Sequence, residues 1–155
     1  MRILAFLLAL PLCAQQLPPF EGQNLLDKKV RLPDGHAAVL LIGFTHASQN
    51  QTKPWSVKIA SQLPTWNISV LEDVPRLVRG MVSHSIKSSV PENLRERFLL
   101  VYHGEKELKQ AAAFSTPDDA YVLVLDKLGS IQWKFHGPVT DAAFERLKAQ
   151  MAATP

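Results

Sequence analysis

The sequence is almost free of cysteine: one residue, Cys13, occurs among 155. A single cysteine supplies neither the paired thiols of a disulfide framework nor the clustered thiolates of a structural zinc site. The chain is nevertheless long enough for one domain with a proper core. Its 46% hydrophobic and 20% charged residues are typical of an ordinary globular protein.

Several recognition motifs are also absent. No GxGxxG or GxxxxGK[ST] pattern occurs, so nucleotide sites of those kinds are unsupported. None of the histidines shows the short spacing of zinc ligands; they are His36, His46, His84, His103 and His136. We therefore predict no cofactor and no metal. The net charge of +3 is scattered, without a basic stripe interleaved with aromatics, which argues against a nucleic-acid partner.

Long apolar runs are confined to the N-terminus. Met1 and Arg2 precede an apolar stretch over 3–12 that is too short to cross a bilayer. A small residue, Ala14, then offers a cleavage point. This pattern is typical of a secretory signal peptide. We predict a signal peptide over 1–14 and a secreted or periplasmic protein.

Cys13 leaves a second interpretation open, because lipoproteins use a cysteine as the first mature residue. The residue before such a cysteine is normally small, whereas Leu12 precedes Cys13 here. We therefore favour simple cleavage after Ala14 over a lipid anchor at Cys13. The mature chain would then have no thiolate nucleophile and no cysteine metal ligand.

The mature chain divides into a polar lead-in over 15–29 and one domain over 30–155. Apolar runs predict strands, and apolar residues at helical spacing predict helices. Strands are expected at 30–32, 37–43, 68–71, 98–102, 121–125 and 131–135. Helices are expected from near Pro54, over 75–90, 91–97 and 106–114, and after a capping Thr140.

Strands that alternate with helices require a mostly parallel sheet with helices on both faces. The last two strands are joined by a turn over 126–129, so they form a hairpin at one edge of the sheet. We predict an α/β fold: a three-layer α/β/α sandwich with a mixed sheet, a C-terminal β-hairpin and a terminal helix.

This layout and its motifs resemble the thioredoxin-like superfamily. In "AVLLIGFTHASQNQ" a buried strand leads into a polar loop, and the resemblance places Ser48 and Gln51 at the two positions of the superfamily's cysteine pair. Thr116-Pro117, ahead of "YVLVL", resembles the threonine–cis-proline that faces that pair. The resemblance implies that these four residues are degenerate active-site positions, and it leaves Pro117 open to either cis or trans.

A narrower likeness rests on "VRLPDG", "LLIGF", a cysteine-free loop that ends in a tryptophan, and "YVLVLDKLGSIQWKFHG". Together these resemble the mitochondrial ATP-synthase assembly factor family and its bacterial redoxin-like relatives. That family is similar in fold to peroxiredoxins without depending on a redox cysteine. Its mitochondrial members assist incorporation of a membrane subunit. The resemblance implies a protein partner, of a membrane-associated kind in that family, and no particular oligomeric state.

Two polar clusters near the loop invite chemical interpretations. Serine catalysis at Ser48 requires a partnered base, and His46 lies two residues away, but no aspartate in that segment orients it. We expect instead that Ser48 and its polar neighbours bond backbone groups at the helix start. Asp118-Asp119 can be read as a carboxylate pair, yet two aspartates before a strand more often form a solvated turn.

The stretch from Pro75 to Val90 combines apolar residues with Arg76 and Arg79, and Met81 is a soft, adaptable contact residue. Such a pattern suits a partner-binding or membrane-surface helix, for which Arg76, Arg79 and Met81 are the candidate contacts. It also suits an ordinary amphipathic helix packed on the sheet, which we favour because such helices are commoner.

The sequence therefore predicts a secreted thioredoxin-like binding or assembly module without catalysis. The alternative is a thioredoxin- or peroxiredoxin-type oxidoreductase that works without a thiol. A reactive thiol would discriminate between the two, and the predicted mature chain has none.

Overall fold

The computed structural model describes residues 14–155. The apolar core of the predicted signal peptide and Cys13 lie outside the described residues. Within 14–155, no helix is both long enough and apolar enough to cross a membrane.

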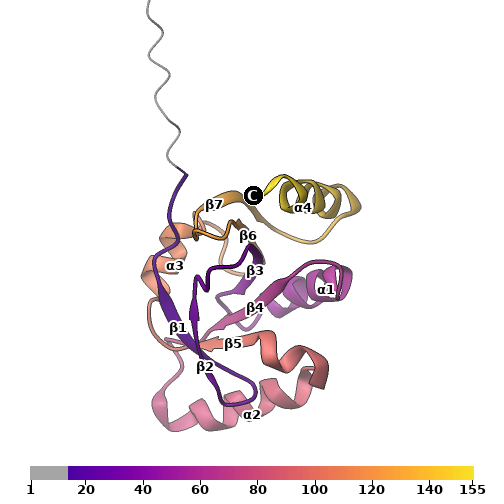
Figure 1. Cartoon of the computed structure of the whole chain (residues 1–155). Helices are drawn as coiled ribbons and strands as arrows, with labels where there is room; N and C mark the ends of the chain where they lie inside the picture. Colours follow the sequence, from indigo (N-terminus) through magenta and orange to yellow (C-terminus); the bar gives the residue numbers. More distant parts are fainter. Residues whose placement is uncertain (1–13) are drawn as a thin grey trace, which may run out of the picture.

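A seven-stranded mixed sheet forms the centre of the molecule (Figure 1). The strands are β1 (Phe20–Asn24), β2 (Lys29–Leu32), β3 (Ala38–Gly43), β4 (Thr65–Val70), β5 (Phe98–Val101), β6 (Tyr121–Leu125) and β7 (Ile131–His136). Their order is β2-β1-β5-β4-β3-β6-β7. β3, β4 and β5 are parallel, whereas the other neighbours are antiparallel.

The central strands are buried on both faces because their sequences are continuously apolar. Every residue of β3 and β6 is buried. Successive side chains alternate between the faces of a sheet. Val39 and Leu41 therefore enter one core, and Leu40 and Ile42 enter the other.

Helices cover both faces of the sheet and complete three layers (Figure 1). They are α1 (Gln49–Ile59), α2 (Arg79–Ser89), α3 (Glu105–Ala111) and α4 (Asp141–Ala153). Trp55 of α1 and Phe144 of α4 belong to the core on one face, and Leu108 of α3 belongs to the core on the other. The predicted three-layer α/β/α sandwich with a closing hairpin and terminal helix is thus confirmed.

The lead-in contains a strand, β1, that the sequence pattern does not predict. Its sequence FEGQN has one large apolar residue, yet it pairs with β2 on one side and β5 on the other. Gly22 allows this close approach, because a Cβ there would lie 2.6 Å from the Leu99 side chain and 2.7 Å from the Leu100 carbonyl. Backbone pairing, rather than an apolar pattern, therefore determines this strand.

The residues just before β1 attach to the other edge of the sheet. The Leu17 N–H donates to the Gly129 carbonyl at 2.9 Å, and the Ile131 N–H donates to the Gln15 carbonyl at 2.7 Å. This short antiparallel contact covers the start of β7.

Helix α1 begins earlier than predicted. It starts at Gln49 and contains Pro54, whereas the sequence analysis places its start near that proline. The Thr52 N–H bonds the Ser48 carbonyl at 2.9 Å, so the first turn is closed before the proline. The proline ring costs the helix one bond, to the Asn50 carbonyl, and Asn50 is exposed to water.

The connection from β4 to β5 departs most from expectation. It contains two 3-10 segments, η1 (Arg76–Val78) and η2 (Glu92–Arg97), which flank α2, and none of the three elements has a buried residue. Helix α2 is amphipathic, as the favoured prediction has it, but its inner side, with Val82 and Ile86, is only half-buried. Leu77 of η1 is 99% exposed and Met81 of α2 73% exposed, so both side chains face solvent.

Candidate functional site

The loop between β3 and α1 holds the first degenerate position, Ser48. Its side chain is buried, with 1% exposure. Its hydroxyl donates to the Thr45 carbonyl at 2.7 Å, and its N–H donates to Thr45 Oγ1 at 3.1 Å. A Cβ at Gly43 would lie 2.5 Å from this hydroxyl, so the glycine makes room for it. Ser48 is thus a helix-start residue with no approach for a substrate.

His46 does not act as a base for Ser48. Its Nδ1 lies 3.3 Å from Gln49 Nε2, and the Ser48 hydroxyl is directed to backbone instead. The expectation of backbone bonding at the helix start describes this loop correctly, and a serine–histidine pair is not formed.

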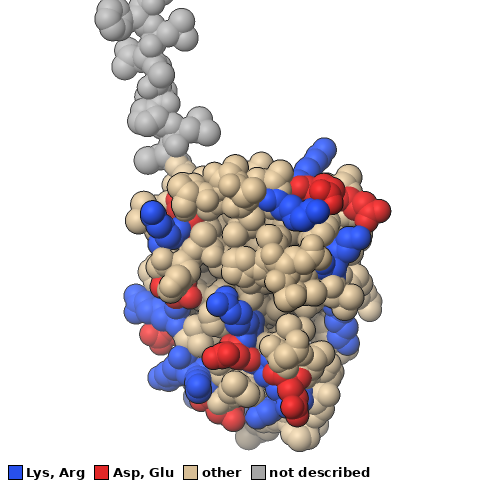
Figure 2. Space-filling model, turned by 45° about the vertical axis from the view of Figure 1, so that its right-hand side comes forward, with Lys and Arg blue, Asp and Glu red and all other residues tan. Residues whose placement is uncertain are grey.

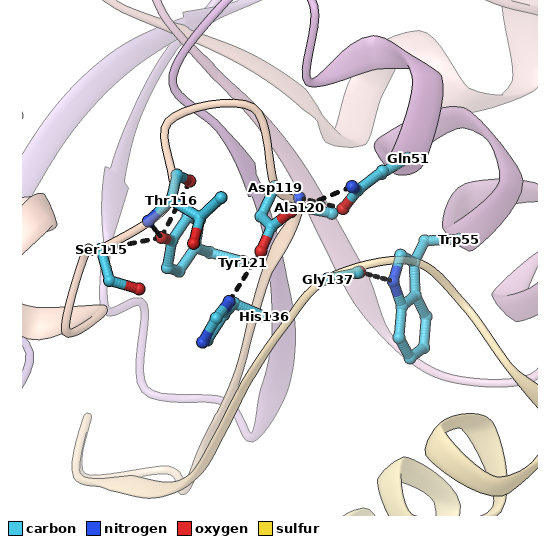
Figure 3. A network of polar contacts seen from close by, with 9 residues as sticks. All are labelled: Gln51, Trp55, Ser115, Thr116, Asp119, Ala120, Tyr121, His136 and Gly137. Atoms are coloured by element: carbon cyan, nitrogen blue, oxygen red, sulfur yellow. Dashed lines mark hydrogen bonds and ion pairs between the residues drawn. The ribbon is translucent and has the colours of Figure 1, made fainter.

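Gln51, at the second degenerate position, cross-links two elements through both ends of its amide (Figure 3). Its Nε2 donates to Asp119 Oδ1 at 3.0 Å, and its Oε1 accepts from the Ala120 N–H at 2.9 Å. These bonds join α1 to the loop that enters β6. The side chain therefore closes the space between α1 and this loop.

Asp119 extends this network to the end of β7. His136 Nδ1 lies 2.8 Å from Asp119 Oδ2. An ionised carboxylate only accepts, so Nδ1 carries the proton and donates. The hydrogen bond from His136 holds the pKa of the Asp119 carboxyl below its usual value; burial opposes this effect, and the bond from Gln51 adds to it.

The loop backbone around Thr116 is occupied by the protein's own Tyr121. The Ser115 and Thr116 N–H groups each donate to the Tyr121 hydroxyl at 2.9 Å. That hydroxyl donates in turn to the Thr116 carbonyl at 3.1 Å. Tyr121 is fully buried, so this clamp is a fixed part of the core.

Pro117 is in the trans form; within 14–155 the cis peptide bond is Leu32–Pro33. The cis geometry left open by the resemblance is therefore not adopted. The Asp119 N–H approaches the Thr116 carbonyl at 3.3 Å, which makes Pro117 the second residue of a four-residue turn. A trans proline fits that position well.

Asp118 and Asp119 form more than the expected solvated turn. Asp118 Oδ1 accepts from the Thr45 hydroxyl at 2.7 Å, while Asp119 binds Gln51 and His136. The two carboxylates thus tie the loop to α1 and to β7. In the described part of the chain, no three His, Cys, Asp or Glu side chains gather as metal ligands.

Aromatic rings line the same end of the sheet. Tyr121 stacks on Phe114 at 5.5 Å and on His136 at 5.4 Å between ring centroids, and Phe44 meets both Phe114 and Tyr121 edge-on. The Lys109 ammonium lies 4.6 Å from the Phe114 ring centre. This packing further fixes the loop.

An open groove of about 610 Å³ adjoins the aromatic cluster. One acid–base pair lies in it, where Lys109 Nζ contacts Glu105 Oε1 at 2.5 Å. The Glu105 backbone N–H donates to Glu72 Oε2 at 2.7 Å. The groove is lined by Glu72, Asp73, Glu105, Lys106, Lys109, Gln110, Ala113 and Phe114.

The candidate partner contacts lie outside this site, on η1 and α2. Arg76 and Met81 are exposed, but Arg79 is used internally. Its Nε donates to the Val74 carbonyl at 2.9 Å, and its guanidinium lies 4.8 Å from the centre of the Tyr102 ring. Burial raises the pKa of Tyr102, and Arg79 partly offsets that rise.

The site has contacts that sequence reasoning did not reach. The Asp118-Asp119 pair is visible as a motif, but its links to Gln51 and His136 join residues more than fifteen positions apart. Similarly, Trp55 Nε1 donates to the Gly137 carbonyl at 2.9 Å, across to the β7–α4 connection. Only the folded sheet brings these groups together.

The face shown in Figure 2 carries Lys and Arg side chains interspersed with Asp and Glu, without a continuous field of one sign. Steering of a polyanion needs a concentrated basic surface, which this face lacks.

No family model and no curated protein matches this sequence. Solved structures do match. BsSco, a member of the Sco family of cytochrome c oxidase assembly proteins, is 12% identical with a TM-score of 0.60, over 90% of this chain and 95% of that one. The exposed lipoprotein thioredoxin of Streptococcus pneumoniae is 14% identical with a TM-score of 0.57, over 85% and 99%.

A peroxiredoxin-like protein from Aquifex aeolicus is 11% identical with a TM-score of 0.58, over 88% of this chain and 86% of its own. At such identities the likeness establishes architecture alone. Together with the seven-stranded mixed sheet, the closing strand pair and the terminal helix, it shows that this chain has the thioredoxin-like fold.

Proposed function

We propose that this protein is a non-catalytic thioredoxin-like module for binding or assembly. One observation carries the proposal. Gln51, which the resemblance aligns with the second cysteine, uses its side-chain amide for hydrogen bonds to Asp119 and Ala120. Thiol chemistry requires a thiolate at this junction. The described residues contain no cysteine, and the buried Ser48 hydroxyl is a donor to backbone.

The loop opposite α1 supports the same proposal. A thioredoxin-type enzyme must let a substrate chain approach between the cysteine loop and the proline loop. Here the N–H groups of Ser115 and Thr116 already bond Tyr121. The backbone N–H groups of this loop are therefore already used in hydrogen bonds within the protein.

Sequence likeness favours assembly as the task. The motifs of the β3 strand and the closing hairpin resemble the ATP-synthase assembly factor family, which does not depend on a redox cysteine. BsSco, a structural neighbour, is likewise described as belonging to a family of assembly proteins. With the predicted signal peptide, we infer that the protein works outside the cytoplasm, on a membrane-associated complex.

Two assays on the chain that begins at Gln15 test this function. We expect neither reduction of insulin disulfides by dithiothreitol-recharged protein nor consumption of hydrogen peroxide above a buffer blank. We expect the same protein to retain a subunit of a membrane complex, with ATP-synthase subunits probed first, from the native membrane fraction. Turnover in either redox assay would instead establish the thiol-independent oxidoreductase.

A further inference from the structure

We propose that Gln15, which becomes the first residue on cleavage after Ala14, is a modification site whose side chain closes onto its own α-amine to give pyroglutamate. This proposal rests on the proposed function through the predicted signal peptide, because only removal of that peptide creates the α-amine. It concerns the N-terminal segment, where Gln15 and Leu17 bond the start of β7, and not the degenerate site.

The reaction is complete within one residue. The unprotonated α-amine of an N-terminal glutamine attacks the amide carbon Cδ of its own side chain. A bond from the α-nitrogen to Cδ forms, the bond from Cδ to Nε2 breaks, and the departing nitrogen takes one amine proton and leaves as ammonia. Nothing is oxidised or reduced, and no co-reactant is consumed. Because both groups belong to one residue, the step needs no encounter between molecules.

The fold uses only those groups of Gln15 that cyclisation keeps. Its backbone carbonyl accepts from the Ile131 N–H at 2.7 Å, and its Oε1 accepts from Lys134 Nζ at 2.5 Å. Both oxygens persist in pyroglutamate, the first as the chain carbonyl and the second as the lactam carbonyl. The leaving nitrogen, Nε2, has no hydrogen-bond partner among residues 14–155. The modification therefore removes no contact that the described residues make.

Gln15 is also accessible for the reaction. Ala14 and Gln15 are both exposed, so the bond between them is open to a peptidase and the released α-amine is in water. Leu17, by contrast, is buried, and its N–H donates to the Gly129 carbonyl at 2.9 Å. The reacting residue thus lies at the free end of a segment that is fixed from Leu17 onward.

The charge at this edge favours the lactam. A protonated α-amine would put a second positive charge on the residue whose side-chain oxygen already binds the Lys134 ammonium. Like charges this close repel each other. Cyclisation removes the α-charge and leaves an uncharged oxygen for Lys134, so the attraction is kept and the repulsion is lost.

The next glutamine does not offer the same match. Gln16 Nε2 donates to Ser130 Oγ at 2.5 Å, and the two residues are paired as an antiparallel bridge. Cyclisation of Gln16 would expel the nitrogen that makes this bond. The contacts therefore distinguish Gln15 from Gln16 as the residue that can be modified without loss.

A pyroglutamate at position 15 would preserve the contact of this segment with β7. General aminopeptidases bind a free α-amine, and the lactam has none. Loss of Gln15 and Gln16 would remove the carbonyl that binds the Ile131 N–H and the amide that binds Ser130. The blocked end thus protects the pairing from exopeptidases outside the cytoplasm.

Mass spectrometry of the exported protein tests the site. The full chain is expressed with its own leader, and the processed protein is isolated and held at neutral pH for increasing times. We expect its N-terminal peptide to begin at residue 15 and to lose the mass of one ammonia. Pyroglutamyl aminopeptidase should then release one residue and expose the α-amine of Gln16.

Gln15→Asn is the matched control. Its amide is one methylene nearer to the α-amine, so closure would require a smaller, strained ring, and the α-amine stays free. A general aminopeptidase should therefore shorten the Gln15→Asn protein during a digestion that leaves the cyclised wild type intact. Circular dichroism of the two proteins should agree before digestion.

Thermal unfolding tests the structural match. Cyclisation of Gln15 should change the Tm by less than about 1 °C, because every bond of the residue is kept. Cyclisation of a shortened chain that begins at Gln16 should lower its Tm by about 2 °C or more, because the bond to Ser130 is lost.

Several outcomes would overturn the proposal: a mature chain that begins elsewhere, including at a lipid-modified Cys13, a Gln15 that keeps its free α-amine, or an equal fall in Tm on cyclisation at either glutamine. A Gln15 that stays open would leave the module function standing. Redox turnover would refute the module function and leave the modification in place.

Discussion

At the scale of single residues, the polar groups at the start of α1 are bonded within the protein. Ser48 and Gln51, which the sequence resemblance aligns with a cysteine pair, are both used for internal hydrogen bonds. The half-buried Gln51 amide satisfies both a carboxylate and a buried N–H, so its removal is costly because these partners are then left without bonds. Gln51 is therefore a structural tie between α1 and the β6 loop.

Gln51→Ala should lower the free energy of unfolding by about 1–3 kcal/mol, since the buried Ala120 N–H loses its partner. Urea denaturation measures the effect. Asn50→Ala, at the exposed neighbouring position, is the control and should change stability by less than about 0.5 kcal/mol. Equal effects at the two positions would contradict the role assigned to Gln51.

Asp119 should make the free energy of unfolding depend on pH in the acid range. Its pKa is lowered in the folded protein, chiefly by the bond from His136. The unfolded chain therefore binds a proton on Asp119 more readily than the folded protein does. The ionised Asp119 stabilises the folded protein fully above its ordinary pKa of about 4, and this stabilisation is lost as the pH falls through the lower pKa of the folded state.

Thermal unfolding of wild type, Asp119→Asn and the exposed control Asp73→Asn between pH 7 and pH 2 measures this dependence. Asp119→Asn should be less stable than wild type at pH 7 and approach it at the acid end. A constant difference across this range would exclude the ionised Asp119 as the cause.

At the scale of elements, one polar contact joins α1 to the end of β7, and another caps α4. Trp55 of α1 is buried, and its Nε1 donates to the carbonyl of the buried Gly137, just after β7. The Thr140 hydroxyl caps α4 by accepting from the Ala143 N–H at 3.1 Å. Both helices contribute to the same core through Trp55 and Phe144.

Trp55→Phe should cost about 1–3 kcal/mol of unfolding free energy, because the Gly137 carbonyl is left buried without its donor. Trp133→Phe is the matched control, since Trp133 is only half-buried on β7. Guanidinium denaturation compares the two. A larger loss at Trp133 would contradict the importance given to the indole hydrogen bond.

The sequence predicts some of these elements well and others poorly, for physical reasons. β3 and β6 can be predicted from the sequence because a strand that is covered on both faces must be continuously apolar. β1 escapes detection because it is held by its neighbours' backbone and by the space at Gly22. The segment over 75–90 has helical spacing, but spacing does not reveal which side faces the protein, so its exposed apolar face appears only in the structure.

At the scale of the whole molecule, the chain has the thioredoxin-like fold, and the described residues 14–155 contain no cysteine. The degenerate site can be located from the sequence because Ser48 and Gln51 follow a recognisable strand. Its closure cannot, since it depends on Asp119 and His136, which approach only when β6 and β7 join the sheet. Placing sulfur at the buried Ser48 position should therefore not give an accessible thiol.

The variant Ser48→Cys, in a chain starting at Gln15, should react slowly with Ellman's reagent when folded and rapidly in urea. The Ser48 position is 1% exposed, so a sulfur there is shielded from the reagent. Val57→Cys, on the solvent side of α1, should react at once. Rapid reaction of the folded Ser48→Cys variant would show that the site is open.

If the predicted signal peptide is removed after Ala14, the contact of Gln15 and Leu17 with the start of β7 has a consequence for that cleavage. Cleavage at the predicted point leaves the residues that pair with the start of β7. Removal of a few more residues would expose unpaired backbone N–H and C=O groups of this edge strand, to which other molecules could bind. Accurate cleavage by the signal peptidase would thus be a safeguard against aggregation, and a recombinant product should preserve its native first residue.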